Sequence, residues 1–342
     1  MLVARSTAQA EDAHVVTVID VARQAGVSSA TVSRVLNGNT TVTAEMRERV
    51  TAAVKRLDFR PNPMAQGLRK GQTNTVALLV GDIAQTHFAE LTMQLQAALE
   101  ENGIDLLLYN LGHSAKRLAE FLVRCVSMRL RGVVVALSDN ISRSAAPLFT
   151  NLEESGIRVV SIGQDLTRFG IPSIVHDERA AAQRSVSYLL AKGHTRIAYV
   201  GRIKGSAVGT ERFRGYQSAL VHAGAYREDL VWDKAFRYAA GRDAVTYALE
   251  SGAQFTAVQA ASDEIAMGAL AALRDHGRSV PDDVSIIGFG DVQMGAYLRP
   301  SLTTLSSHPE MAARHVCSIL TAGDDSAGAI ILERALIKRE SA

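Results

Sequence analysis

VIDVARQAGVSSATVSRVLNG, residues 18–38, is the stretch that decides the fold of the amino-terminal part of the chain. Apolar residues recur at helical spacing before Gly26 and again after Ser28, which predicts two short helices joined by a tight turn. Gly26 can supply the positive φ of that turn, and Ser28 is a suitable N-cap for the second helix. The pattern is typical of a helix-turn-helix, in which the second helix enters the major groove of DNA. An ordinary helical hairpin with a solvated face is the alternative for such a motif on its own.

The outward side chains of the second helix are short or polar, as a helix in a DNA groove requires. Arg34 among them can donate to the O6/N7 edge of a guanine. A third helix is expected in TAEMRERVTAAVKRLDF, residues 43–59, with Thr43 as its N-cap. The outward set is Ser29, Ala30, Ser33, Arg34 and Asn37.

NPMAQGLRKG, residues 62–71, has the signals of a helix but not the length of a stable one. Asn62 is a good N-cap and Pro63 suits the first helical position, yet Gly67 lies inside the segment. Isolated helices become marginal only at about 12 to 15 residues, so a partner must stabilise this one. A polar, Gly-containing segment, RKGQTNT at 69–75, then precedes the first strand-like run, which we take as the domain boundary.

Residues 17–80, read without a gap from TVIDVARQAGVSS to NTVALLV, resemble the lactose-repressor (LacI/GalR) family of transcriptional regulators. The resemblance implies that the short segment is a hinge helix, which folds when two copies meet in a kinked minor groove. Leu68 would wedge into the central base step there, with Ala65 small enough to permit close approach. Packing of Leu68 on the body is the alternative. The resemblance also assigns phosphate contact or helix positioning to Thr17, Ser28, Thr31 and Asn37, and base reading to Ser29, Ala30 and Arg34.

Composition and charge fit a DNA-binding head on a larger globular body. The chain has 342 residues, 47% of them hydrophobic, and a formal charge of +2. Residues 1–71 hold ten Lys and Arg against six Asp and Glu, so the head is basic and the remainder slightly acidic. The start of the chain does not read as a secretory signal, and no apolar run of 18 residues occurs. Cys125 and Cys317 lie in apolar helical patterns and are expected to be buried free thiols.

From Thr75 the sequence alternates between apolar runs, such as TVALLV and GVVVAL, and segments with helical spacing. Alternation of this kind predicts a parallel sheet covered by helices on both faces. The pattern starts again at RIAYVG, residues 196–201, so two similar halves are expected. The resemblance extends over nearly the whole chain and implies a type I periplasmic-binding-protein-like fold. Such a fold has two Rossmann-like lobes, three crossovers and a ligand cleft between the lobes.

The resemblance also implies an effector site in that cleft. Arg212, in GTERFRGY, stands where the family uses an arginine to hold its ligand, and Ser262 and Asp263 come at the next position. His87 and Phe88 lie on the first loop of the N-terminal lobe. Exposure at a helix start is the alternative for Arg212, and helix capping is the alternative for Asp263.

Two positions depart from the family pattern, which often places a hydroxyl-binding Asp before each cleft loop. Gly163 and Gly290 stand there, and Asp165 and Asp291 lie one or two residues away. The departure removes negative charge from around Arg212, which favours an anionic effector such as a sugar acid or sugar phosphate. A neutral sugar held by Asp165 and Asp291 is the alternative.

An enzyme and a transport-type binding protein are the two alternatives to a regulator. GFGDVQMG has only part of a dinucleotide fingerprint, and no nucleophile motif or metal-ligand spacing occurs, so we expect no catalytic residue, no metal and no cofactor. A transport-type sugar-binding protein shares the architecture of the body. The helix-turn-helix and the missing signal argue against it.

The sequence therefore predicts a small all-α helix-turn-helix head on an α/β body of two lobes. We expect a cytoplasmic homodimer, associated with the nucleoid when bound, that is not an enzyme and has no membrane segment. Its partners would be a near-palindromic double-stranded operator and a small effector, and we expect it to act on a carbohydrate-related operon as a repressor. The expected parts are a disordered extension at 1–16, the head at 17–61, the hinge and linker at 62–74, and the body at 75–342. Within the body, the N-lobe would take about 75–175 and 303–325, and the C-lobe about 176–302 and 326–342.

Overall fold

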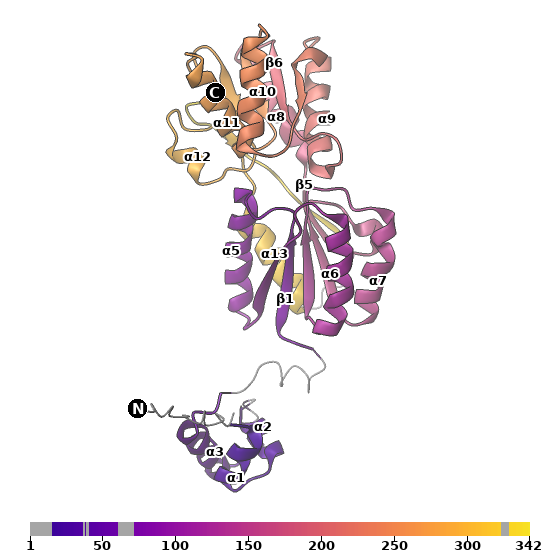
Figure 1. Cartoon of the computed structure of the whole chain (residues 1–342), viewed down its shortest axis with the longest axis vertical. Helices are drawn as coiled ribbons and strands as arrows, with labels where there is room; N and C mark the ends of the chain where they lie inside the picture. Colours follow the sequence, from indigo (N-terminus) through magenta and orange to yellow (C-terminus); the bar gives the residue numbers. More distant parts are fainter. Residues whose placement is uncertain (1–15, 37, 39–40, 61–71, 323–327) are drawn as a thin grey trace, which may run out of the picture. The chain divides into compact units, whose positions relative to one another are not determined.

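The computed structural model describes residues 16–36, 38, 41–60, 72–322 and 328–342. The chain divides into two compact units, Met1–Gly71 and Gln72–Ala342. Both are visible in Figure 1, and each is treated by itself. The expected extension at 1–16 lies outside the described residues except for Val16, and most of the expected hinge at 62–74 also lies outside them.

The described part of the first unit contains three helices around a small apolar core. Thr17 caps the first helix in a reciprocal capping box with Asp20, and Gly26 ends it in the left-handed region at φ 62°. The expected turn at Gly26 is therefore confirmed. Thr43 accepts a hydrogen bond from the backbone N–H of Met46 and caps the third helix, as predicted. The helices are α1 (Val18–Ala25), α2 (Ser29–Leu36) and α3 (Ala44–Arg56).

The N-terminal lobe of the second unit is built on a six-stranded parallel sheet in the order β11-β5-β4-β3-β1-β2. Its strands are nearly continuous apolar runs because helices cover both faces. Along β1, Val76 and Leu78 pack in one apolar cluster, whereas Ala77 and Leu79 pack in a second cluster. The strands are β1 (Thr75–Val80), β2 (Asp105–Asn110), β3 (Gly132–Ala136), β4 (Arg158–Ile162), β5 (Ser173–His176) and β11 (Ala329–Leu332).

Helices on the two faces of this sheet are placed as the alternating sequence predicts. In Figure 1, α5 lies on one side of the sheet and α6 and α7 lie on the other. Cys125 on α6 and Cys317 on α13 are both buried and free, as expected. The helices of this lobe are α5 (Thr86–Glu100), α6 (Ala115–Met128), η1 (Arg143–Ala145), α7 (Ala146–Glu154), η2 (Thr167–Phe169) and α13 (Pro309–Ala322).

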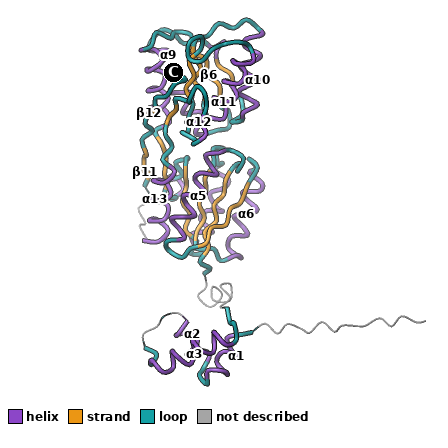
Figure 2. The backbone as a smooth tube through the Cα atoms, turned by 90° about the vertical axis from the view of Figure 1, so that its left-hand side faces the viewer, coloured by secondary structure: helices purple, strands orange, loops and turns teal. Residues whose placement is uncertain are grey.

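The C-terminal lobe has a four-stranded parallel sheet in the order β7-β6-β8-β9. Helices α8 and α9 pack together, as do α10 and α11, and Figures 1 and 2 show α9 and α10 on opposite sides of β6. The elements are α8 (Glu178–Ala191), β6 (Ile197–Gly201), α9 (Ala207–His222), η3 (Glu228–Leu230), β7 (Val231–Asp233), α10 (Tyr238–Glu250), β8 (Ala257–Ala260), α11 (Asp263–Asp275), β9 (Ser285–Ile287) and α12 (Met294–Tyr297).

The end of the chain is divided between the lobes differently from our expectation. Strand β10 (Thr304–Leu305) pairs with β12 (Leu336–Ile337), and Leu305 packs in the core of the C-terminal lobe, not the N-terminal one. Strand β11 instead pairs with β5 in the N-terminal sheet. The expected boundaries at 303 and 326 are therefore wrong, because short strand pairings over long sequence separations set them. The chain passes between the lobes three times, after β5, after β10 and after β11.

Candidate functional site

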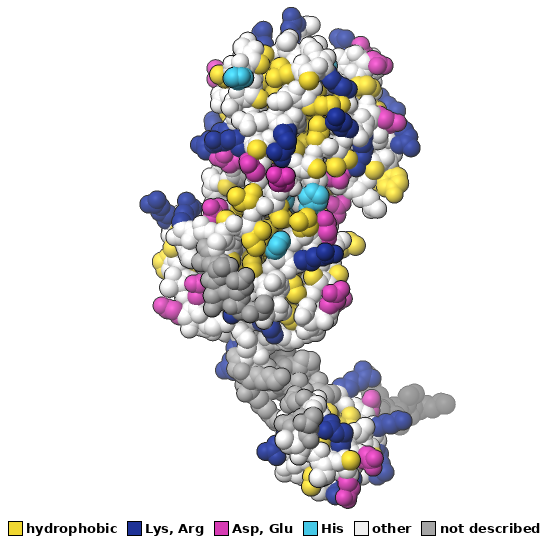
Figure 3. Space-filling model, turned by 180° about the vertical axis from the view of Figure 1, so that it is seen from behind, with side chains coloured by type: hydrophobic (Ala, Val, Ile, Leu, Met, Phe, Trp, Pro, Cys, Tyr) yellow, Lys and Arg dark blue, Asp and Glu magenta, His cyan; other side chains and the backbone are white. Residues whose placement is uncertain are grey.

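The candidate DNA-contacting surface of the head is the outer side of α2. Val32 is fully buried against the other helices, and this contact turns Ser29, Ala30 and Arg34 outward, where all three are exposed. Thr31 and Ser33 are half-buried at the edge of this surface. On the face shown in Figure 3, Lys and Arg side chains project from the head.

Hydroxyl groups hold the start of α2 in place. The Ser28 hydroxyl oxygen accepts a hydrogen bond from the backbone N–H of Thr31 at 3.1 Å and lies 2.9 Å from the Thr31 hydroxyl oxygen. The Thr17 hydroxyl donates to Asp20 at 2.6 Å at the start of α1. Helix N-termini of this kind present backbone N–H groups that suit phosphate oxygens. Four residues expected to contact DNA lie outside the described residues: Asn37, Asn62, Ala65 and Leu68.

The candidate effector site is a cavity between the two lobes of the second unit. It encloses about 820 Å³ that contains no protein atoms, part of it open to solvent. Six of the residues expected there line it: His87, Phe88, Gly163, Arg212, Ser262 and Gly290.

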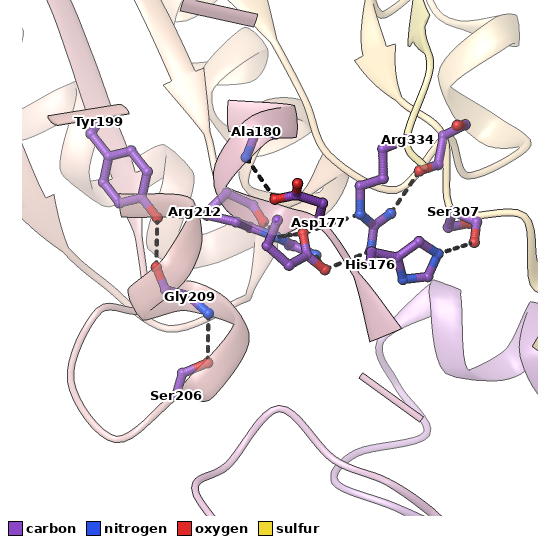
Figure 4. A network of polar contacts seen from close by, with 12 residues as sticks. His176, Asp177, Ala180, Tyr199, Ser206, Gly209, Arg212, Ser307 and Arg334 are labelled. Carbon is purple, nitrogen blue, oxygen red and sulfur yellow. Dashed lines mark hydrogen bonds and ion pairs between the residues drawn. The ribbon is translucent and has the colours of Figure 1, made fainter. Parts of the chain in front are cut away.

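A buried cluster of two arginines and one glutamate forms the charged part of the cavity. Glu178 is the first residue of α8, and Arg212 on α9 donates to its carboxylate at 2.9 and 3.2 Å. Arg334, which follows β11, donates to the same two oxygens at 3.1 and 2.8 Å. Figure 4 shows Arg212 and Arg334 approaching from these two elements. Burial alone would raise the pKa of Glu178, but the two guanidinium groups outweigh burial and hold that pKa well below its usual range.

Backbone carbonyls and an aromatic ring complete the surroundings of the two arginines. Arg212 Nη1 donates to the carbonyl of Ala261 at 2.5 Å, and Arg334 Nη1 donates to that of Ser306 at 2.7 Å. Both guanidinium groups lie over the ring of Phe289, 4.0 and 5.1 Å from its centroid. The arginine side chains are therefore fixed in position before any ligand arrives.

Two histidines line the cavity in their neutral form. Burial lowers the pKa of His87 to about 4 and that of His176 to about 3. His176 Nε2 lies 2.8 Å from the carbonyl oxygen of Ser307 and must donate to it, because a carbonyl only accepts. In neutral His176 the proton is thus on Nε2, and Nδ1 is left as an acceptor.

Asp263 and Asp291 do not line the cavity, contrary to expectation. Asp263 is fully buried and accepts hydrogen bonds from the Thr304 hydroxyl at 2.6 Å and the Val292 N–H at 2.8 Å. Burial raises its pKa to about 6. Asp291 forms an ion pair with Arg339 at 2.6 Å. Both carboxylates therefore hold the segments that follow β9 within the C-terminal lobe.

The expected loss of negative charge around Arg212 is also contradicted. Glu178 occupies one side of its guanidinium, so the carboxylate is supplied from α8 and not from the positions of Gly163 and Gly290. Those glycines have φ values of 88° and 136°, which side-chain-bearing residues rarely adopt. Their presence is explained by backbone geometry and does not indicate an anionic ligand.

Sequence reasoning missed Glu178 and Arg334. In VHDE, residues 175–178, Asp177 accepts a hydrogen bond from the backbone N–H of Ala180 at 2.9 Å and caps α8. Glu178 directly follows this cap, and an acid at that place is the one local signal that could have identified it. Arg334 lies in ILERALIKRESA, and nothing local in that segment indicates a buried partner.

Polar contacts join the two lobes on either side of the cavity. On one side Arg202 pairs with Asp139 at 2.6 Å, and His113 Nδ1 also lies 2.6 Å from Asp139. Gln85, which lines the cavity, is 3.3 Å from the other ring nitrogen of His113. Elsewhere the backbone N–H of Thr86 donates to Glu264 at 2.8 Å, Gln293 N–H donates to Glu90 at 3.0 Å, and Arg237 pairs with Asp82.

The described residues hold no group of three or more His, Cys, Asp or Glu side chains that could bind a metal ion. Within the same residues, no helix is long and apolar enough to cross a membrane.

A helix-turn-helix head and a two-lobed body with a cavity define a class of ligand-responsive DNA-binding proteins, and the comparisons agree. Residues 17–62 match "Bacterial regulatory proteins, lacI family", and residues 186–342 match "Periplasmic binding protein-like domain". Catabolite control protein A of Priestia megaterium is 32% identical over 292 residues, covering 85% of this chain and 87% of that protein. The chain belongs to the lacI family of bacterial regulatory proteins and is a DNA-binding transcriptional regulator.

Two solved structures have the same architecture. A complex of the transcriptional regulator CelR with cellobiose is 30% identical, with a TM-score of 0.69, and covers 95% of this chain and 99% of that one. The lac repressor dimer bound to operator and an anti-inducer is 23% identical, with a TM-score of 0.85, and covers 95% and 98%. Because the lac repressor dimer is only 23% identical to this chain, its similarity concerns the fold alone.

Proposed function

We propose that this regulator is a cytoplasmic homodimer that represses carbohydrate-related genes from a near-palindromic operator and responds to a small effector in its cleft. One combination of features carries the proposal. The same chain has a head with Ser29, Ala30 and Arg34 exposed on α2 and a body with a cavity lined from two lobes.

Base reading is assigned to the exposed side chains of α2. Ser29 and Ala30 are short enough to let the helix approach the base edges, and Arg34 can donate to guanine in a bidentate manner. Thr17, Ser28, Thr31 and Ser33 would contact phosphates or hold the helix in register. The roles expected for Asn37, Asn62, Ala65 and Leu68 remain part of this proposal, and replacement of Leu68 by alanine tests the minor-groove wedge.

The homodimer is supported by exposed apolar side chains on α5 and α12. Met93 is 70% exposed, Met294 57% and Tyr297 70%. The contact of Gln293 with Glu90 brings the start of α12 next to α5, and we take their exposed apolar side chains as one apolar area. A second copy would bury it, and a twofold dimer requires inverted half-sites in the operator.

A carbohydrate effector is supported by the CelR relative, whose solved complex contains cellobiose. In this chain Arg212, Arg334, Ser262 and Ser138 would contact the ligand, and Phe88 and Phe289 would pack against its ring. Asp263 and Asp291 are left out, because their carboxylates hold neighbouring segments of the same lobe.

Effector control would act through the relative position of the lobes. Gln85 lines the cavity and is joined through His113 and Asp139 to Arg202 of the other lobe. A ligand with different affinity for the closed and open arrangements shifts their populations, and operator binding must then change effector affinity by the same factor.

Enzyme and transport functions are disfavoured. The relatives are regulators, and the three charged side chains of the cavity are paired with one another, which is typical of a binding site held rigid. A transport protein would share the body but would have no use for the helix-turn-helix.

A gel-shift assay with genomic fragments tests the regulatory function. We expect one or a few fragments to bind specifically in the presence of excess random DNA, and a thermal-shift screen of sugars to raise the melting temperature. Uniform binding of all fragments would contradict the proposal, as would turnover of a sugar in the absence of any shifted band.

A further inference from the structure

We propose that Gln85 is a proton-controlled group of the cleft. It offers its amide oxygen to a ligand while His113 is neutral, and it offers its amide nitrogen once His113 is protonated. The two ring nitrogens of His113 impose this behaviour. Its value to the regulator rests on the proposed effector function of the cleft, because a change of pH would then change which ligand groups the cleft can bind.

Asp139 fixes the hydrogen atom on one ring nitrogen of His113. His113 Nδ1 lies 2.6 Å from one oxygen of Asp139, and Arg202 Nη1 lies 2.6 Å from the other oxygen. Burial alone would raise the pKa of Asp139, but the contacts with His113 and Arg202 outweigh burial and hold that pKa below its usual range. An ionised carboxylate only accepts hydrogen bonds, so His113 Nδ1 carries a hydrogen atom in both charge states of the ring.

The charge state of His113 therefore decides the role of the other ring nitrogen, Nε2. This atom lies 3.3 Å from the amide nitrogen of Gln85. In a neutral ring with its hydrogen atom on Nδ1, Nε2 is an acceptor, which matches the N–H groups of the amide. Gln85 lines the cavity, and its amide oxygen has no hydrogen-bond partner among the described residues. That oxygen is therefore available to accept from a ligand hydroxyl.

Protonation of His113 makes this arrangement unfavourable. Both nitrogens of the charged ring donate, so the Nε2–H group would face the N–H groups of Gln85, a side chain that is buried. A buried donor without an acceptor costs free energy. Half a turn of the amide removes the conflict, because the amide oxygen then accepts from Nε2–H. The N–H groups then face the cleft, where they suit a carboxylate or carbonyl oxygen of a ligand.

Charged side chains on the elements around His113 are engaged with partners of their own. Gly81, on the loop before α5, borders the ring, since a side-chain carbon there would lie 3.1 Å from His113 Cε1. An ordinary imidazole has a pKa of about 6.5, so the ring is the group in this network whose charge responds to pH near neutrality. The charged side chains are Asp139 with Arg202, Asp82 with Arg237, and Arg117 over the ring of Tyr109.

NMR of the full-length protein with isotope-labelled glutamine and histidine tests the rotation without any ligand. The signals of Gln85 and His113 are those that disappear in Gln85→Met and His113→Asn. At about pH 9 we expect a nuclear Overhauser contact between the amide protons of Gln85 and the ring C–H protons of His113. This contact should be lost by about pH 5.5, with the same midpoint as the titration of the ring nitrogens.

Gln164 provides the control for the amide signals. Its amide nitrogen donates to the carbonyl of Leu137 at 2.9 Å, and its oxygen accepts from the N–H of Ile141 at 3.2 Å, so no titrating group sets its orientation. Its proton contacts should be the same at both pH values. A Gln85 contact that persists while His113 titrates would overturn the proposal, and so would a His113 ring that keeps one charge over the whole range.

A variant pair tests the contact on which the switch depends. Gln85→Glu replaces the amide by a carboxylate that only accepts, which stabilises the protonated ring. The midpoint of the His113 titration should therefore rise by at least about one pH unit. Gln94→Glu makes the same change at an exposed position on α5 and should leave the midpoint unchanged. An unchanged midpoint in Gln85→Glu would contradict the proposal.

Operator binding, measured on the same proteins, separates this inference from the proposed function. If the wild type binds its operator specifically but the Gln85 amide keeps one orientation, only the switch is refuted. If the wild type has no operator specificity, the proposed function is refuted, and the NMR titration still decides whether the amide rotates.

Discussion

Glu178 and Arg334 lie 156 residues apart in the sequence and are joined by two hydrogen bonds of 2.8 and 3.1 Å in the cleft. The same carboxylate holds Arg212, so one acid fixes two arginines that come from different parts of the chain. An ion cluster of this kind is buried before any ligand binds. Its removal therefore affects stability as well as ligand binding.

Glu178→Ala should lower the free energy of unfolding by about 3–5 kcal/mol, because two buried guanidinium groups lose their counter-charge. Urea denaturation of the full-length protein measures the change. Glu211→Ala is the control, since Glu211 pairs with Arg179 and Arg214 on the surface and should cost at most about 1 kcal/mol. Similar losses of unfolding free energy in the two variants would show that the buried Glu178 cluster stabilises the fold no more than a surface ion pair does.

His176 should make the folded protein less stable as the pH falls below 6.5. Its pKa is about 3 in the folded protein, against 6.5 for an ordinary imidazole. The unfolded chain therefore binds more protons between these values, so stability rises with pH through the window by about 1.4 kcal/mol per unit for this group. His176→Gln keeps a donor for Ser307 and should reduce the slope between pH 4.5 and 6.5. Identical slopes in the two proteins would contradict the buried neutral histidine.

Asp263 has the opposite effect on the pH dependence of stability over part of the same pH range. Its pKa of about 6 means that the folded state holds a proton that the unfolded state has already released, so its contribution to stability falls as the pH rises from about 4 to 6. The comparison of wild type with His176→Gln cancels this effect because both proteins contain Asp263.

Arg202→Ala should open the cleft, because it removes the ion pair with Asp139 between the lobes. Spin labels at Thr150→Cys on α7 and Val221→Cys on α9 report the distance between lobes, and the two native cysteines are buried. We expect a longer and broader distance distribution than in the otherwise unsubstituted labelled protein. Arg242→Ala breaks a 2.8 Å pair with Asp275 inside one lobe and should leave the distribution unchanged. No difference between the two variants would exclude this ion pair as a determinant of closure.

Tyr297→Asp should weaken the proposed dimer, since a charge would be buried in the apolar area formed by α5 and α12. Sedimentation velocity at micromolar concentration measures the monomer fraction. Val123→Asp is the control, because Val123 is 58% exposed on α6, on the other side of the sheet from α5 in Figure 1. A dimer that survives Tyr297→Asp but dissociates with Val123→Asp would show that the interface includes α6 and not α12, which would contradict the proposed dimer.

Local sequence signals predicted the parts of this protein that depend on neighbouring residues. Gly26 ends α1 and Thr43 caps the start of α3, as predicted, because turn and cap geometry depends on residues only a few positions apart. The alternation of apolar strands and helices gave the two lobes for the same reason. Arg212 was placed in the cleft through the family resemblance, not by its spacing.

Long-range pairings could not be predicted in this way. The partner of Arg212 is Glu178 at the start of the neighbouring helix α8, and that of Asp291 is Arg339 near the chain end. The packing of α8 against α9 determines which acid faces the cleft, and no local sequence pattern predicts that packing. The assignment of β11 to the N-terminal sheet depends on pairing with β5 and was missed for the same reason.

The most direct test of the account is the affinity of the head for its operator with and without Arg34. Genomic selection provides the operator, and fluorescence anisotropy at fixed salt then compares wild type, Arg34→Ala and Arg23→Ala on operator and on random DNA. Arg34→Ala should weaken operator binding by about 1–3 kcal/mol and relax the preference at one base pair per half-site. Arg23→Ala removes the same charge from α1 and should weaken binding to both DNAs alike. Equal affinity of wild type for operator and random DNA, or unchanged specificity in Arg34→Ala, would contradict sequence-specific recognition by α2.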